Sequence, residues 1–195
     1  MSWHEQPPHG TVLDWITNVK YLVHIACNMN ELKFDVVTEA HVGPLLAMAR
    51  AFHSEDGHPL TPDGEAAVEQ IARGDSLVRA WIVLEAAQMI GYVVLTLGYS
   101  IEHGGRDGFI DDLYLIPEAR GGGRGKRVLA FALGQAAALG IKTLHLEVEI
   151  DNERARRVYQ AAGFVQNNRR LMSKRLCSSV QSTFDKEPTK GANLT

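Results

Sequence analysis

The sequence has only two cysteines, Cys27 and Cys177, and they stand far apart in the chain. A small secreted scaffold held by disulfides normally has more. No apolar run approaches the roughly 20 residues that a membrane-spanning helix needs. A basic signal-peptide start is also lacking, because His4 and Glu5 occupy the positions where Lys or Arg is expected. These absences predict free thiols, no membrane association and a cytoplasmic location.

Neither sign of charge dominates, with 20 Lys and Arg against 23 Asp and Glu, and a formal net charge of −3. This balance argues against a broad basic surface for nucleic acid or anionic lipid. A cationic ligand would therefore have to be held by local carboxylates. With 45% apolar residues, the 195-residue chain is long enough to bury a core without disulfides or metals.

The ends of the chain differ in composition from its middle. Residues 1–30 are predicted to be an N-terminal extension, in which Val12, Trp15 and Val19 have helical spacing. Met29 opens what looks like a domain start, so this extension is either a non-native start or a genuine extra helix. Residues 31–177 form the predicted domain, and the polar residues 178–195 are expected to be disordered.

Apolar periodicity and helix-capping residues predict an α/β fold with a mixed sheet and helices on both faces. The predicted order is strand 32–36, helices 38–53 and 61–73, strands 78–85, 89–97 and 109–116, helix 123–139, strand 142–150, helix 152–162, and strands 164–166 and 171–176. This order is β-α-α-β-β-β-α-β-α-β-β. Residues 100–108 are predicted to be a loop.

A glycine-rich turn lies between a predicted strand and the helix at 123–139, a context in which backbone N–H groups bind anions. The residues concerned are Arg120, Gly121, Gly122, Gly123, Arg124, Gly125, Lys126 and Arg127. Arg127 stands where a Walker A loop needs Ser or Thr, and Lys126 replaces the third glycine of a Rossmann fingerprint. A pyrophosphate site without either nucleotide motif is one interpretation. A glycine turn with solvated arginines is the other.

Two segments together resemble the GNAT superfamily of acyl-CoA-dependent N-acetyltransferases. Arg120, Gly123 and Gly125 match its Arg/Gln-x-x-Gly-x-Gly/Ala signature. A second match consists of Asn152, Ala155, Tyr159, Gly163 and Phe164. The resemblance covers about residues 32–176. It implies a GNAT-like fold with splayed fourth and fifth strands, acetyl-CoA as cosubstrate and no metal.

The resemblance also implies roles for particular residues in binding acetyl-CoA. Backbone groups near Leu113 and Leu115 would pair with the pantetheine arm, as in strand addition. Backbone N–H groups of residues 120–126 would hold the pyrophosphate, and an N–H near Leu113 would face the developing oxyanion. Asn152 would bond the pantetheine arm, although a helix N-cap alone also explains its position.

Tyr159 is the predicted general acid, because the leaving thiol has a pKa of roughly 8.5 and a phenol one near 10. A half-buried aromatic residue with its hydroxyl in water is the alternative. Glu147 resembles the base of family members that acetylate protein N-termini, and the strand with Asp111 resembles that of diamine acetyltransferases. Both are therefore candidate bases, and a water chain would serve as well. Adjacent strand residues point to opposite faces, so one of Asp111 and Asp112 should face the site unless a bulge intervenes.

The acceptor side is predicted from acidic and aromatic residues near loops. Glu55 and Asp56 follow the first helix and would attract a cationic amine, or form a charged surface turn. Asp112 would face the amine, and Tyr99 would line its pocket. Three histidines flank loops without metal-binding spacing, and surface or capping roles are expected for them; they are His53, His58 and His103.

These predictions favour direct transfer of an acetyl group from acetyl-CoA to the primary amine of a small molecule, most like the diamine-type enzymes. Two alternatives remain open: a protein N-terminal acetyltransferase, and a non-catalytic acyl-CoA-binding module. Many members of the resembled family are homodimers, so a homodimer is expected, with a small-molecule amine as partner and no nucleic acid or membrane.

Overall fold

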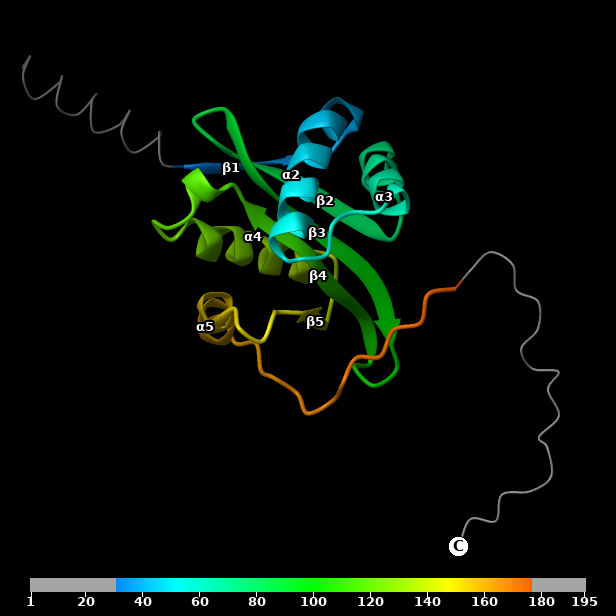
Figure 1. Ribbon diagram of the computed structural model, residues 1–195. Helices are drawn as coiled ribbons and strands as arrows, with labels where there is room; N and C mark the ends of the chain where they lie inside the picture. The colour runs from blue at the N-terminus through cyan, green and yellow to red at the C-terminus, as the bar shows by residue number, and fades with distance from the viewer. Residues whose placement is uncertain (1–30, 177–195) are drawn as a thin grey trace, which may run out of the picture.

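A mixed five-stranded sheet forms the centre of the computed structural model, which describes residues 31–176 (Figure 1). The strands are β1 (Leu32–Val36), β2 (Val78–Glu85), β3 (Gln88–Ser100), β4 (Gly105–Leu115) and β5 (Thr143–Leu146). They lie in chain order, antiparallel from β1 to β4, and β5 runs parallel to β4. The predicted mixed α/β fold is confirmed. Residues 1–30, the tail and both cysteines lie outside the described residues.

In the part of the chain that the structure describes, four α-helices cover the two faces of the sheet, two on each side (Figure 1). They are α2 (Val42–Glu55), α3 (Pro62–Arg73), α4 (Arg124–Ala138) and α5 (Glu153–Ala161), with short 3-10 helices η1 (Glu39–His41) and η2 (Pro117–Ala119). The helices α2 and α3 pack on one face, and α4 and α5 on the other. Within residues 31–176, no helix combines the length and apolar character that crossing a bilayer requires.

Local sequence accounts for where three of the helices begin or end. Thr61 caps α3 by accepting a hydrogen bond from the Gly64 backbone N–H at 3.3 Å. Asn152 caps α5 in the same way, accepting from the Ala155 N–H at 3.0 Å. Gly140, at φ 73°, follows the end of α4. The first helix starts later than predicted, because η1 intervenes between Thr38 and Val42.

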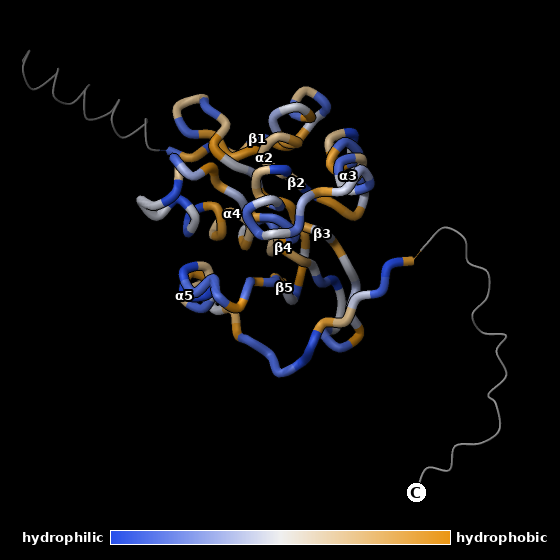
Figure 2. Tube along the Cα trace, in the orientation of Figure 1, coloured by the Kyte–Doolittle hydropathy of each residue, from blue (hydrophilic) through white to orange (hydrophobic). Residues whose placement is uncertain are grey.

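Each face of the sheet has its own apolar layer. On the α4 side, Trp81, Val83 and Leu95 pack against Val128 and Ala132 of α4. The other layer joins β2 to β4 with α2 and α3, through residues such as Leu45, Ala49, Ile82 and Tyr92. Figure 2 shows the same division, with hydrophobic strands at the centre and a mostly hydrophilic α5. Burial of these side chains is the main favourable contribution to folding.

The C-terminal part of the domain departs from the predictions. The strand expected over 142–150 ends at Leu146, and the strands expected over 164–166 and 171–176 are wrong, because this stretch of the structure contains no strand. Backbone bonds from Asn152 N–H to the Glu149 carbonyl and from Glu153 N–H to the Asp151 carbonyl turn the chain into α5 instead. The segment after α5 is held by a side-chain ion pair instead of by backbone pairing with the sheet. Arg169 binds Glu102 in a bidentate manner, at 2.7 and 2.8 Å.

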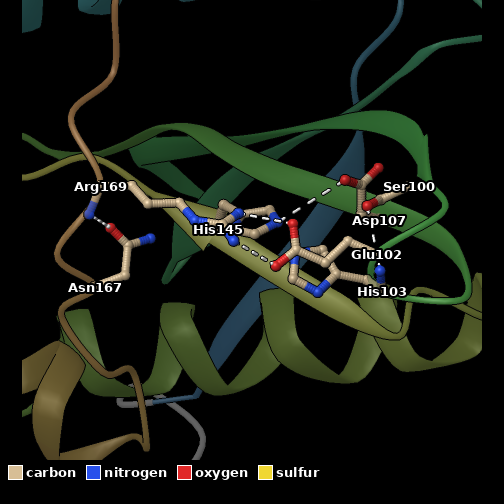
Figure 3. A network of polar contacts seen from close by, with 7 residues as sticks. All are labelled: Ser100, Glu102, His103, Asp107, His145, Asn167 and Arg169. Carbon is tan, nitrogen blue, oxygen red and sulfur yellow. Dashed lines mark hydrogen bonds and ion pairs between the residues drawn. The ribbon is translucent and has the colours of Figure 1, made fainter.

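The loop predicted over 100–108 is instead a hairpin turn. Strand β3 runs to Ser100, which is paired with Gly105 at the start of β4. Gly104 has a φ of 70°, a conformation that glycine adopts without strain. A polar network lies at this turn (Figure 3), where Glu102 binds Arg169 and the His103 and His145 rings lie 5.1 Å apart. The turn is therefore tied to β5 and to the C-terminal segment.

Gly91 allows β3 and β4 to approach closely, and we predict that Gly91→Ala destabilises the fold. A Cβ at this position would lie 2.2 Å from the Tyr114 carbonyl oxygen and 3.1 Å from Leu115 Cα, which are backbone atoms. Overpacking of this kind costs about 1–3 kcal/mol, so the midpoint of chemical denaturation should fall clearly.

Gly134→Ala is the matched control. It lies inside α4 with nothing within 4 Å of an added Cβ, and removing a helical glycine should stabilise the fold by about 0.5–1 kcal/mol. Equal midpoints for the two variants would contradict the close-approach argument.

Candidate active site

A β-bulge sits in the middle of β4, at Asp111. Val94 pairs with Asp112 and Leu95 pairs with Ile110, so Asp111 is an extra residue in β4. The bulge resets the alternation of side chains. Ile110 packs in the α4-side layer, as Leu113 does, whereas Asp112 is hydrogen-bonded to Tyr92 of the α2-side layer. Asp112 therefore faces α2.

The strands β4 and β5 separate just beyond the bulge. Their pairing ends at Ile110 and Leu146, while β4 continues to Leu115. In the described chain, no strand pairs with residues 111–115 on that side. This is the predicted splay, and Leu113 and Leu115 lie in it. Unpaired strand backbone of this kind can accept an extended ligand as an additional strand.

The glycine-rich turn leads from η2 into the N-terminus of α4. Gly121, Gly122 and Gly123 have φ values of 91°, 57° and 76°, all in the region that side chains disfavour. The first N–H groups of a helix have no intrahelical partner, and here they belong to residues such as Gly125 and Lys126. These N–H groups and the positive end of the helix dipole can bind an anion.

Two arginines of the turn are bound to carboxylates of the protein. Arg124 contacts Glu85 at the end of β2 with its Nε at 2.9 Å and its Nη2 at 2.8 Å. Arg120 donates to Glu55 at 2.6 Å and to the Leu115 carbonyl oxygen at 2.9 Å. These bonds hold the turn against the sheet and against α2. The backbone of the turn, rather than these two side chains, then offers the groups that can bind an anion.

An acidic cavity of about 390 Å³ opens between the C-terminal end of α2 and the loop before α5. Its lining residues are Glu55, Asp56, Glu149, Asp151 and Asn152. Sequence analysis had singled out Glu55, Asp56 and Asn152, and the structure brings them together. It missed Glu149 and Asp151, although the acidic run before Asn152 was visible. His58 Nε2 lies 3.8 Å from Oε1 of Glu149, one of these lining residues.

Tyr159 of α5 belongs to the same region. Its ring packs against Phe164, with centroids 6.0 Å apart, and borders the α4-side layer. Burial raises the pKa of the Tyr159 phenol above its usual value, and the Asp56 carboxylate raises it further. The hydroxyl is therefore protonated at neutral pH, as a proton donor must be.

Asp112 lies at the centre of a small hydrogen-bonded cluster. The Tyr92 hydroxyl donates to Asp112 Oδ2 at 2.8 Å, and His53 Nε2 lies 3.5 Å from the same oxygen. Burial raises the pKa of the Asp112 carboxyl, while the bond from Tyr92 and the proximity of His53 oppose that rise. Burial also raises the pKa of the more exposed Asp111, and His53 again opposes it. No sequence pattern connected His53 to β4.

The structure does not bring two predicted residues to this cluster. Tyr99 pairs with Arg106 beside the hairpin turn and is 79% exposed. Glu147 is exposed just past the end of β5. Among residues 31–176, no three His, Cys, Asp or Glu side chains are arranged to hold a metal ion.

Two curated proteins of Bacillus subtilis (strain 168) resemble part of the chain. The uncharacterized N-acetyltransferase YhfO is 34% identical over 83 residues, 43% of this chain and 56% of its own length. The uncharacterized N-acetyltransferase YycN is 43% identical over 76 residues, 38% of this chain and 47% of its own length. The chain spans about half the length of these curated relatives.

Solved structures resemble the chain over a larger part. The integron cassette protein HFX_CASS3, from the mobile metagenome of Cole Harbour Salt Marsh, is 32% identical with a TM-score of 0.63, covering 74% of this chain and 90% of its own. The aminoglycoside N-acetyltransferase AAC(6')-Iy in complex with CoA is 17% identical with a TM-score of 0.62, covering 75% and 96%. The second likeness concerns the fold alone.

The family comparison covers the whole candidate site. The sequence model of the acetyltransferase (GNAT) family matches residues 45–164, from α2 to the end of α5. That range includes the acidic cavity, the bulge, the glycine-rich turn and Tyr159. The chain therefore belongs to the acetyltransferase (GNAT) family.

Proposed function

We propose that this protein transfers an acetyl group from acetyl-CoA to the primary amine of a small cationic molecule. The acidic cavity beside the open edge of β4 carries this proposal. Four carboxylates line the cavity, and although Glu55 is paired with Arg120, the others leave an excess of negative charge there in a chain whose net charge is only −3. Such a local concentration of negative charge favours a cation. A diamine or polyamine would place its second charge there.

The donor side of the site has the elements that acetyl-CoA needs. The unpaired edge of β4 near Leu113 and Leu115 would pair with the pantetheine arm. The N–H groups between Arg120 and Lys126 would hold the pyrophosphate, and Asn152, at the rim of the cavity, would bond the arm. That a structural neighbour was solved in complex with CoA supports this assignment.

The chemical step is a direct transfer. The acceptor nitrogen forms a C–N bond with the carbonyl carbon, the C–S bond breaks, and the nitrogen loses one proton. A β4 backbone N–H near Leu113 would stabilise the developing oxyanion. Tyr159 would donate a proton to the departing thiolate. Catalysis then depends mainly on positioning and on preorganised hydrogen bonds. A cytoplasmic location and a homodimer are part of the same proposal.

The first test measures thiol release from acetyl-CoA with a panel of diamines, monoamines, aminoglycosides and N-terminal peptides. We expect turnover with small cationic amines. Tyr159→Phe should lower kcat by about 10²-fold, because general acid catalysis contributes 10²–10⁴-fold, without changing the affinity for acetyl-CoA. The matched control is Tyr99→Phe, at an exposed tyrosine beside the hairpin turn. Turnover of peptides alone would support N-terminal acetylation, and tight binding without turnover would support a binding module.

The acidic cavity makes a separate prediction about selectivity. Asp56→Asn should raise KM for a diamine by about 2–5-fold, since a partly exposed ion pair contributes about 1 kcal/mol or less. KM for a neutral-tailed monoamine of equal length should change little. Asp35→Asn, an exposed carboxylate on β1, is the control. An equal loss with both amines would contradict recognition of a second charge.

A further inference from the structure

The acceptor nitrogen must lose a proton during the reaction, and one residue near the acidic cavity is placed to accept it. His53 lies in the last turn of α2, two residues before Glu55 of the acidic cavity. Its side chain also reaches β4, where it lies beside Asp112. It thus connects the end of α2, where Glu55 lines the cavity, to the α2-side face of β4. Its side chain is 30% exposed, so it is accessible to a ligand.

Asp112 orients the His53 ring. One carboxylate oxygen, Oδ2, accepts from the Tyr92 hydroxyl at 2.8 Å and lies 3.5 Å from His53 Nε2. Tyr92 is itself buried, and Asp112 is only 12% exposed, so the carboxylate has little freedom to move. A carboxylate beside Nε2 favours the tautomer that carries its proton there. The lone pair is then on Nδ1, the other ring nitrogen.

We propose that His53 is the catalytic base of the reaction, with Asp112 as its positioning residue and Tyr92 holding Asp112. This inference rests on the proposed function. As the C–N bond forms, the nitrogen becomes strongly acidic, and its proton passes to His53 Nδ1. The C–S bond breaks, and the thiolate takes the proton of Tyr159. Exchange with solvent then restores both side chains.

Charged and polar groups from three elements surround His53. Asp111 and Asp112 face it from β4, and Tyr92 of β3 reaches it through Asp112. Glu55 follows two residues later on the same helix. The other candidates fit the role less well. Asp112 Oδ2 is already engaged by Tyr92 and His53, and Glu147 is exposed past β5.

The test is the pH profile of kcat/KM for the best amine, measured on wild type and on His53→Gln. Protonated His53 cannot act as a base, so the wild-type rate should fall as the pH is lowered. In His53→Gln the acidic limb assigned to His53 should disappear, and kcat should fall by about 10²-fold, the usual size of general base catalysis. The affinity for acetyl-CoA, measured by calorimetry, should be unchanged, which also shows that the variant folds.

Two further variants separate a base from a packing residue. Asp112→Asn keeps the shape but removes the charge, and should move the acidic limb to lower pH with a smaller loss of kcat. His103→Gln, in the distant hairpin network (Figure 3), should behave as wild type. An unchanged acidic limb in His53→Gln, with an active wild type, overturns the inference and leaves the proposed function standing. A wild type that acetylates no amine overturns both.

Discussion

The strands β4 and β5 separate after Ile110 and Leu146, and the candidate site is built around this opening. Backbone N–H and C=O groups in a sheet need partners, and a strand that loses its neighbour offers them to whatever enters the gap. The bulge at Asp111 lies at the point of separation. It directs Asp112 toward α2 while Leu113 packs on the α4 side. The strand thus presents acidic chemistry on one face and apolar packing on the other.

An ion pair and two further contacts connect the glycine-rich turn to the acidic cavity. Arg120, in the turn that would hold the pyrophosphate, binds Glu55, which lines the acidic cavity. The Tyr114 hydroxyl donates to the same carboxylate at 3.3 Å, and the Arg120 guanidinium lies 5.4 Å from the Tyr114 ring centre. The donor turn, the central strand and the end of α2 therefore meet at one carboxylate. These contacts fix the positions of the glycine-rich turn and of the end of α2 relative to β4.

Much of the fold followed from local patterns in the sequence. Thr61, Gly140 and Asn152 are capping residues whose effect extends over a single helix turn, so they predict helix ends without knowledge of the tertiary structure. The failures are of a different kind. Alternation over 142–150 is compatible with a strand, but a strand also needs a neighbour, and β5 has one only as far as Leu146. Likewise, Arg169 binds Glu102 across a long separation that no local pattern reveals.

The same division applies to the site. The glycine-rich turn, Asn152 and Tyr159 stand in short motifs, because binding an anion at a helix N-terminus requires neighbouring residues at fixed spacing. The glycine-rich turn was predicted from its spacing, and the roles of Asn152 and Tyr159 from the resemblance to the GNAT superfamily. The cluster of His53, Tyr92 and Asp112 has no such spacing, because its members come from α2, β3 and β4. Which aspartate faces α2 depends on strand register, and a one-residue bulge reverses it. Register follows from packing between strands, so the folded chain was needed to assemble that cluster.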